Sequence, residues 1–244
     1  KTANVSLRIV PEIKTDTLHG LQTALLTSKF GMMQSEAIEA FRIWQDTGYL
    51  NLHGIHLHLG SQNPSAEPYF EAFKTLFASL LEVHRETGKR LSHINLGGGF
   101  PVNYLRDTSQ VRNFSQEQID YFSASLEPAE VLRRAWEVVK ESASEADAAE
   151  LLENLTILLE PGRSVVADAG IVLTTVRNYK DRPINSPALR NPHSAFHHDS
   201  WLLTDAGFNI MLSMETYKWY YHLISATGAG EPHETPYKLA GPLC

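Results

Sequence analysis

The sequence contains one cysteine, Cys244, among 244 residues, so no disulfide can form within the chain. It has no block of lysines and arginines, and its formal net charge is −7. An acidic chain without a basic patch is a poor match for nucleic acid or for an anionic membrane surface. It also shows no signal peptide and no apolar run long enough to span a bilayer. We therefore predict a cytoplasmic protein that binds neither nucleic acid nor membrane.

The residues that are present alternate between strand and helix patterns. Four apolar segments predict strands: 5–10, 52–59, 92–96 and 155–159. Helical spacing predicts helices over 36–47, from Ser65 to Gly88, after the Ser115/Gln118 capping box, and from Pro128 to Lys140. Alternation of this kind is typical of an α/β fold with a parallel sheet. Three of the strands end in the polar turns "HLGS", "GGGFP" and "EPGRS", at the strand ends where barrels and doubly wound sheets carry function.

The pattern changes after residue 165. The segments "GIVLTTVRNYK" (170–180) and "SWLLTDAGFNIML" (200–212) predict strands with no helix between them. We therefore predict an α/β domain over residues 1–165 and a mostly β domain over residues 166–244.

Three consecutive glycines, Gly97, Gly98 and Gly99, follow the third predicted strand. Such a turn exposes backbone N–H groups, which bind anions such as phosphate. The alternative is a tight turn under a packed helix. The glycines alone do not decide between these interpretations.

Two histidines, His56 and His58, lie on one side of the second predicted strand, because side chains alternate along a strand. A His-x-His pattern at a strand end binds zinc in some barrel hydrolases, but no further set of ligands accompanies it here. The ring of His58 would also suit stacking on a flat cofactor, with Ser61 reaching a phosphate. A structural histidine held by hydrogen bonds is the third interpretation.

A carboxylate, Glu160, leaves the fourth strand directly into Pro-Gly-Arg. We expect it to be nearly buried and to need a cationic or donor partner, for which Arg163 is the nearest candidate. The alternative is that Glu160 faces a protonated ring nitrogen while Arg163 faces an anion. A phosphate turn, a flat ring and such a carboxylate together describe a pyridoxal 5′-phosphate site.

Six segments, in order along the chain, resemble the fold-type III pyridoxal-phosphate decarboxylases, and most closely their diaminopimelate decarboxylase branch. They are "SKFGM" (28–32), "GIHLHLGSQ" (54–62), "INLGGGFP" (94–101), "EPGRSVVADAG" (160–170), "DAGFN" (205–209) and "GPLC" (241–244). The resemblance covers nearly the whole chain. It implies the second half of a (β/α)8 TIM barrel followed by part of a C-terminal β-domain.

The resemblance also implies roles for individual residues. His58 would stack on the cofactor ring and Glu160 would hold its nitrogen. The phosphate would be bound by Ser61, Gly97, Gly98, Gly99, Gly162 and Arg163. Arg163, Ser213 and Tyr217 would belong to the substrate end. Cys244 would be a catalytic residue that reaches the partner's site in a head-to-tail homodimer.

The family's Schiff-base lysine has no counterpart here, because Lys29 belongs to the "SKFG" loop and Lys14 to no matching motif. We therefore expect a fragment that is inactive alone. At the position where diaminopimelate decarboxylases carry an arginine, this chain has Ser213, which predicts a substrate whose far end is not a free carboxylate. The alternatives are a decarboxylase for ornithine, lysine, arginine or another biosynthetic amino acid, a His-x-His metal hydrolase, or a non-catalytic phosphate-binding remnant.

Overall fold

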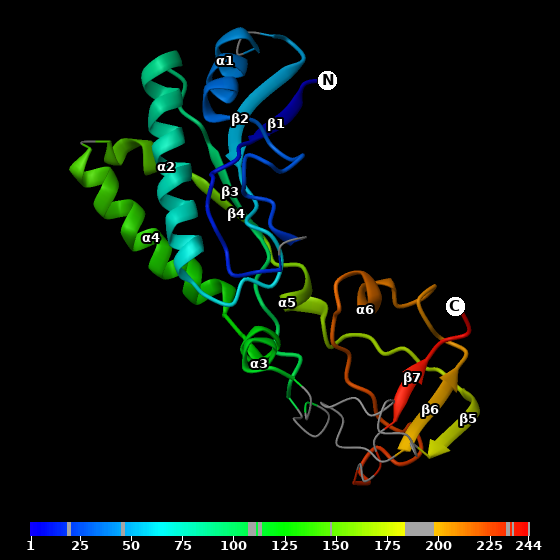
Figure 1. Ribbon diagram of the computed structural model, residues 1–244. Coiled ribbons are helices and arrows are strands. Elements are labelled where there is room, and N and C mark those ends of the chain that lie inside the picture. The colour runs from blue at the N-terminus through cyan, green and yellow to red at the C-terminus, as the bar shows by residue number, and fades with distance from the viewer. Residues whose placement is uncertain are drawn as a thin grey trace. The chain divides into compact units, whose positions relative to one another are not determined.

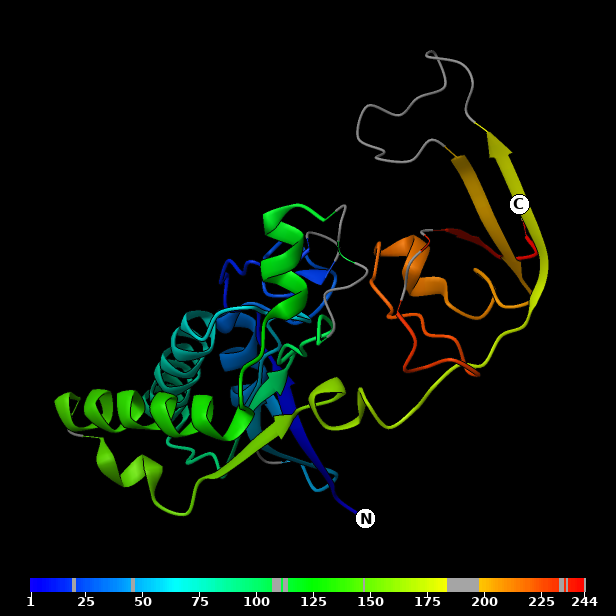
Figure 2. The same cartoon turned by 90° about the horizontal axis from the view of Figure 1, so that it is seen from below.

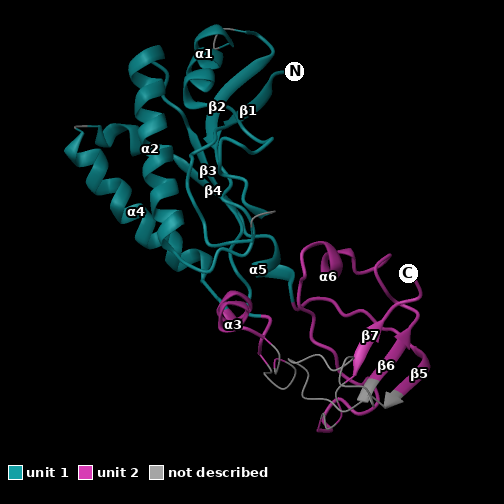
Figure 3. Ribbon diagram, viewed as in Figure 1, with its two compact units in different colours: residues 1–103, 124–167 teal, residues 104–123, 168–244 magenta. Residues whose placement is uncertain are grey.

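The computed structural model describes most of the chain (Figure 1). Described are residues 1–18, 21–44, 47–106, 111, 114–146, 148–183, 198–232, 235 and 237–243, with only the backbone given at 182–183 and 198–199. The chain forms two compact units, residues 1–103 with 124–167 and residues 104–123 with 168–244 (Figure 3). Cys244 lies outside the described residues.

Unit 1 is built on four parallel strands in the order β1-β2-β3-β4. The strands are β1 (Ala3–Arg8), β2 (Leu50–His56), β3 (His93–Gly98) and β4 (Thr156–Glu160). The helices of this unit are α1 (Gln34–Trp44), α2 (Glu67–Thr87), α4 (Pro128–Glu145), the short 3-10 helix η2 (Ala149–Leu152) and α5 (Arg163–Val166). Helices between parallel strands make this a partial barrel arrangement, and the described strands form an open sheet rather than a closed barrel.

Helices cover one face of this sheet. Leu7, Ile55, Ile94 and Ile157 lie in lateral register on the four strands and belong to or pack against the hydrophobic core. Helix α2 contributes a fully buried stripe to the same core, and α4 packs alongside α2 (Figure 2). The stripe has helical spacing and ends at Gly88, whose φ of 71° forms the left-handed cap that glycine favours. The opposite face carries Arg8, His56, Asn95 and Leu158.

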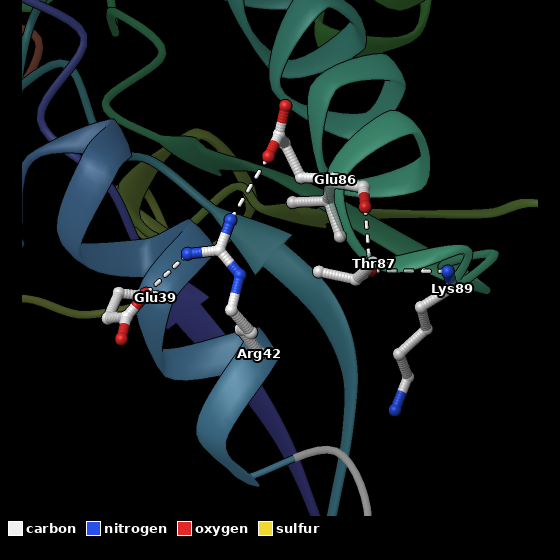
Figure 4. Close-up of polar contacts among 6 residues, drawn as sticks. Glu39, Arg42, Glu86, Thr87 and Lys89 are labelled. Atoms are coloured by element: carbon white, nitrogen blue, oxygen red, sulfur yellow. Dashed lines mark hydrogen bonds and ion pairs between the residues drawn. The ribbon is translucent and has the colours of Figure 1, made fainter.

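One ion pair connects the outer surfaces of α1 and α2, and a second lies within α1. The guanidinium of Arg42 lies 2.6 Å from the carboxylate of Glu39 and 3.0 Å from that of Glu86 (Figure 4). These exposed pairs contribute little stability individually. They line one side of a shallow groove formed by α1 and α2 only, which contains none of the residues that the sequence assigns to a site.

Unit 2 contains a three-stranded sheet in the order β5-β6-β7, with β5 (Val176–Pro183), β6 (His198–Thr204) and β7 (Lys238–Ala240). Its helices are α3 (Gln116–Ser123) and α6 (Leu212–Thr216). The Ser115/Gln118 capping box is confirmed at the start of α3, since each residue's backbone N–H donates to the other's side chain. Aromatic rings from α3 and the segment after α6 pack edge to face, with Phe122 and Trp219 at 5.6 Å.

Helix α4 runs beyond Lys140 to Glu145, because Ala143 is fully buried and continues the apolar stripe. Two expectations about local structure were wrong. Residues 170–175 do not form a strand, since the ladder of β5 with β6 starts only at Val176. Strand β6 likewise stops at Thr204, and beyond it the side chain of Asp205 accepts a hydrogen bond from the N–H of Thr175.

Candidate active site

Polar side chains from the four parallel strands gather near the carboxyl ends of unit 1. Arg8 pairs in register with His56, and His56 pairs with Asn95, so the three side chains share one face of the sheet. Glu160 comes two residues after Leu158, the register partner of Asn95, and therefore shares that face too. We call Arg8, His56, Asn95 and Glu160 the polar row.

Glu160 has contacts with side chains from both β2 and β3. Asn95 Nδ2 donates a hydrogen bond of 2.8 Å to Glu160 Oε1, and His56 Nε2 lies 3.7 Å from the same oxygen. The expectation of near burial was wrong, because 53% of the Glu160 side chain is exposed. The reason is topological: β4 is an edge strand of the described sheet, so its end is open on one side.

Two buried side-chain nitrogens in the polar row have no hydrogen-bond partner among the described residues. Arg8 Nη2 and His56 Nε2 are both buried and unpaired. Buried polar groups normally have partners, so unpaired nitrogens beside a carboxylate indicate a place where a ligand binds. The guanidinium of Arg8 also lies 4.7 Å from the ring centre of Phe30, which fixes it over an aromatic face.

Both histidines of the His-x-His pattern have a lowered pKa. Burial lowers the pKa of His56, with Arg8 acting in the same direction and Glu160 opposing it. Burial likewise lowers the pKa of His58, again with Arg8 in the same direction and Glu160 against it. The alternation predicted from sequence is confirmed, since Leu57 and Leu59 are fully buried on the opposite side.

The ring of His58 is fixed by the glycine turn. The N–H of Gly98 donates to His58 Nδ1 over 3.2 Å, so this nitrogen carries no proton and the ring proton is on Nε2. The N–H of Gly97 donates to Asn95 Oδ1 over 2.8 Å. Two of the three glycine amides therefore have acceptors within the chain, and the turn as a phosphate site stays a prediction.

The three glycines are required by the packing of neighbouring turns. A Cβ on Gly97 would lie 2.5 Å from the Leu57 carbonyl oxygen, and one on Gly98 would lie 1.8 Å from that of Glu160. A Cβ on Gly99 would lie 1.6 Å from the carbonyl oxygen of Gly60. Gly97 and Gly99 also have φ values of 71° and 83°. The atoms that come close to the three glycines are therefore backbone atoms of the protein itself.

Hydrogen bonds from buried residues hold this turn in place. Gln62 and Asn63 are fully buried, and the amide group of Gln62 pairs with both the N–H and the carbonyl of Val102. The N–H of Asn63 donates to the Gly99 carbonyl over 3.0 Å. The hydroxyl of Tyr69 donates to the carbonyl of Gly98, and burial raises the pKa of that hydroxyl. The turn therefore has little freedom to move.

The remaining residues assigned from sequence lie in both units. Ser61 follows the end of β2 and accepts a hydrogen bond at its carbonyl from Thr17. Gly162, with a φ of 55°, precedes Arg163 at the start of α5. In unit 2, the Ser213 hydroxyl lies 2.5 Å from that of Tyr221, and Tyr217 directly follows α6. Of the substrate-end candidates, Ser213 and Tyr217 lie in unit 2, whereas Arg163 lies in unit 1 with the cofactor candidates.

Arg8 and Asn95 were missed by sequence reasoning. Each is a polar residue inside an otherwise apolar strand, "SLRIV" and "INLGG". Aligning the strand ends laterally would have placed both beside His56, because parallel strands pair in register. The His-x-His metal site gains no support, since the described residues contain no group of three metal-ligating side chains.

Comparison with known proteins agrees with this arrangement. Residues 1–167 match the family described as "Pyridoxal-dependent decarboxylase, pyridoxal binding domain". The chain belongs to this family. Its residues fit the cofactor, because the polar row offers a carboxylate and unpaired buried nitrogens beside a flat ring fixed by the turn.

Similar proteins cover the chain along its whole length. The diaminopimelate decarboxylases of Haemophilus influenzae and Methanocaldococcus jannaschii are 29% and 28% identical over 100% of this chain. The crystal structure of the Helicobacter pylori diaminopimelate decarboxylase, complexed with L-lysine, has a TM-score of 0.71 and 25% identity, and covers 100% of this chain. The chain spans about half the length of these relatives, at 48% to 50%.

Proposed function

We propose that this chain is the cofactor-binding part of a pyridoxal-phosphate-dependent amino-acid decarboxylase that is related to the diaminopimelate decarboxylases of lysine biosynthesis. One observation carries the proposal: Glu160, His56 and Asn95 meet at the strand ends beside His58, whose ring is fixed by the glycine turn. Family membership over residues 1–167 supports the cofactor, and the curated relatives support the reaction.

When bound, pyridoxal phosphate supplies an electron sink that accepts the electron pair left as the substrate carboxylate departs as CO₂. Glu160 holds a proton at the ring nitrogen, which keeps the ring electron-withdrawing. His58 presents the flat face of a neutral ring, positioned through its Nδ1. Ser61, Gly99, Gly162 and Arg163 are the proposed phosphate contacts, together with Gly97 and Gly98 where their amides exchange partners.

The substrate end in this proposal includes the position of Ser213. An arginine forms two parallel charge-assisted bonds with a carboxylate, and a serine hydroxyl cannot replace them. Losing such a partner costs about 1.5–3 kcal/mol, or about 10- to 150-fold in affinity. The Ser213 hydroxyl is already paired with Tyr221, so it is a poor substitute. The preferred substrate is therefore an amino acid whose far end carries no free carboxylate.

The assembly of the full protein follows the family pattern in this proposal. Residues 1–165 form the second half of a TIM barrel and residues 166–244 part of a β-domain. Cys244 reaches the active site of the partner in a homodimer. The protein acts in the cytoplasm on a small amino-acid substrate. Among the described residues, no helix is long and apolar enough to cross a membrane.

The test is CO₂ release by the full-length protein from meso-diaminopimelate, lysine, ornithine and arginine, each with added pyridoxal phosphate. We expect release that depends on the cofactor, with diaminopimelate a weak substrate. Ser213→Arg should raise activity on diaminopimelate about tenfold or more, whereas Ser225→Arg, an exposed control in the same unit, should not. Absence of cofactor-dependent release from every amino acid would refute the proposed function.

A further inference from the structure

Asn95 joins two parts of the candidate site through one side-chain amide. Its oxygen accepts the N–H of Gly97 over 2.8 Å, and its NH₂ group donates to Glu160 Oε1 over 2.8 Å. A backbone N–H can only donate and an ionised carboxylate can only accept. The orientation of the amide is therefore fixed by its two neighbours.

The two groups that Asn95 connects differ in mobility. The glycine turn is rigid, since added side chains on it would clash with backbone atoms and buried side chains hold it from below. Glu160 lies at the end of an edge strand and is half exposed, so its three side-chain torsions are free to move unless a partner fixes them. Fixing a flexible side chain of this kind costs up to about 2 kcal/mol of conformational entropy.

We propose that Asn95 is a positioning residue that fixes the carboxylate of Glu160 to the glycine turn. This inference rests on the proposed function, because it assigns Glu160 the task of holding the ring nitrogen. Asn95 itself does not touch the reacting atoms. Its bond occupies Oε1 of Glu160 on the side of the sheet, which directs the second carboxylate oxygen, Oε2, to the cofactor.

Asparagine is suited to this task by its two different amide ends. Aspartate would still accept the N–H of Gly97, but it would place a second carboxylate against Glu160, and two carboxylates at this distance repel each other. Alanine would satisfy neither neighbour. His56 supports the same oxygen of Glu160 from 3.7 Å without forming a hydrogen bond. The direct bond from Asn95 therefore sets the position.

Exchanging the donor and acceptor groups of Asn95 and Glu160 tests their hydrogen bond in the absence of cofactor. Asn95→Asp should raise the unfolding equilibrium constant about 5- to 10-fold, because a hydrogen bond becomes a repulsion. Glu160→Gln alone should cost less, because the glutamine oxygen still accepts from Asn95. In the double variant Asn95→Asp/Glu160→Gln, the glutamine NH₂ donates to the aspartate, and most of the loss should be recovered.

The matched control for the exchange is Asn51→Asp. Asn51 also donates across strands, to Asn4 Oδ1 over 2.9 Å, but near the opposite end of β2. Adding Glu160→Gln to Asn51→Asp should recover nothing. If Asn95→Asp/Glu160→Gln is no more stable than Asn95→Asp, the positioning bond does not exist in solution and the inference is overturned.

A cofactor analogue tests the consequence of positioning. The probe is 4′-deoxypyridoxine 5′-phosphate labelled with ¹⁵N in the ring, which lacks the aldehyde and reports only non-covalent contacts. By ¹⁵N NMR at pH 7.5, the bound ring nitrogen should be protonated in the unmodified chain. Asn95→Ala should reduce the protonated fraction, and in a Glu160→Gln background it should have no additional effect.

The two tests separate the inference from the function. Failure of the unmodified chain to bind the analogue would count against the proposed function, while the exchange experiment would still decide the bond between Asn95 and Glu160. A protonated fraction that is unchanged in Asn95→Ala would overturn the positioning role, even if the analogue binds well.

Discussion

The two ends of the four-stranded sheet each carry a pair of histidines, and the pairs differ in what surrounds them. Near the amino end, His53 Nδ1 and His93 Nδ1 lie 2.6 Å apart, so one nitrogen must donate and the other accept. Near the carboxyl end, His56 and His58 lie close to the charges of Arg8 and Glu160. The same residue type is therefore a mutual pair at one end and part of a charged site at the other.

The turns at the two ends differ in a similar way. The glycine turn at the end of β3 has backbone from two neighbouring turns against it, whereas Gly48, which precedes β2, has no atom of the described residues within 4 Å of a Cβ position. A polar site that must hold a carboxylate and a ring in place needs a rigid frame. The packing around the glycine turn therefore suits a site that must keep its side chains in place.

The largest expected effect comes from adding one methyl group to the glycine turn. Gly99→Ala places a Cβ 1.6 Å from the Gly60 carbonyl oxygen at a φ of 83°. We expect a loss of more than about 3 kcal/mol in the free energy of unfolding, because neither backbone segment has space to move. Gly48→Ala is the control and should change it by less than about 1 kcal/mol. Urea denaturation measures both, and equal losses would remove the distinction between the ends.

Sequence patterns predicted the secondary-structure elements better than the side chains that meet at the candidate site. The strands, the α2 stop at Gly88 and the Ser115/Gln118 box follow from local rules of period and capping, which the chain obeys. Arg8 and Asn95 were missed because their importance comes from lateral register between strands, which no local pattern encodes.

The exposure of Glu160 shows a second limit of sequence reasoning. Its motif predicted the residue, but burial depends on whether another strand pairs with β4, and in the described sheet β3 is its only neighbour. For the same reason Leu158 is 40% exposed although it lies in an apolar strand. Strand order is a property of the assembled sheet, so the partners of Glu160 became evident only from the structure.

The next prediction compares the ends by activity. In the full-length protein, Glu160→Gln should reduce turnover by about 100-fold or more and leave cofactor binding largely intact, because glutamine cannot hold a proton on the ring nitrogen. His93→Gln changes the other end of the sheet and should leave turnover within about twofold. Steady-state CO₂ release and cofactor absorbance measure the two properties. An unchanged rate in Glu160→Gln would make Glu160 a structural partner of Asn95 only.

A smaller effect is expected on the titration of the histidines. Arg8 lowers the pKa of both His56 and His58, so Arg8→Gln should raise these two values and leave His53 unchanged. Lys89 contributes to the lowered pKa of His53, after burial and His93, so Lys89→Gln should raise the value of His53 alone. NMR titration of the imidazole resonances distinguishes the two responses. A change in the pKa of His53 in Arg8→Gln, or of His56 or His58 in Lys89→Gln, would show that the two ends are electrostatically coupled.

The smallest expected effect is the pH dependence of stability near the amino end. Burial first, and then His93 and Lys89, hold the pKa of His53 below its usual value of about 6.5. The folded state therefore binds fewer protons than the unfolded state as pH falls. The stabilising contribution is present above about pH 6.5 and is lost as pH falls through the lowered pKa.

His53→Gln should reduce the pH dependence of the urea midpoint between pH 7.5 and pH 5, but only modestly, because solvent screens this partly exposed ring. His56→Gln should reduce this pH dependence at least as much, since burial is the leading cause there too. A pH dependence that is unchanged in His53→Gln and reduced in His56→Gln would place the proton-linked stability at the carboxyl end alone.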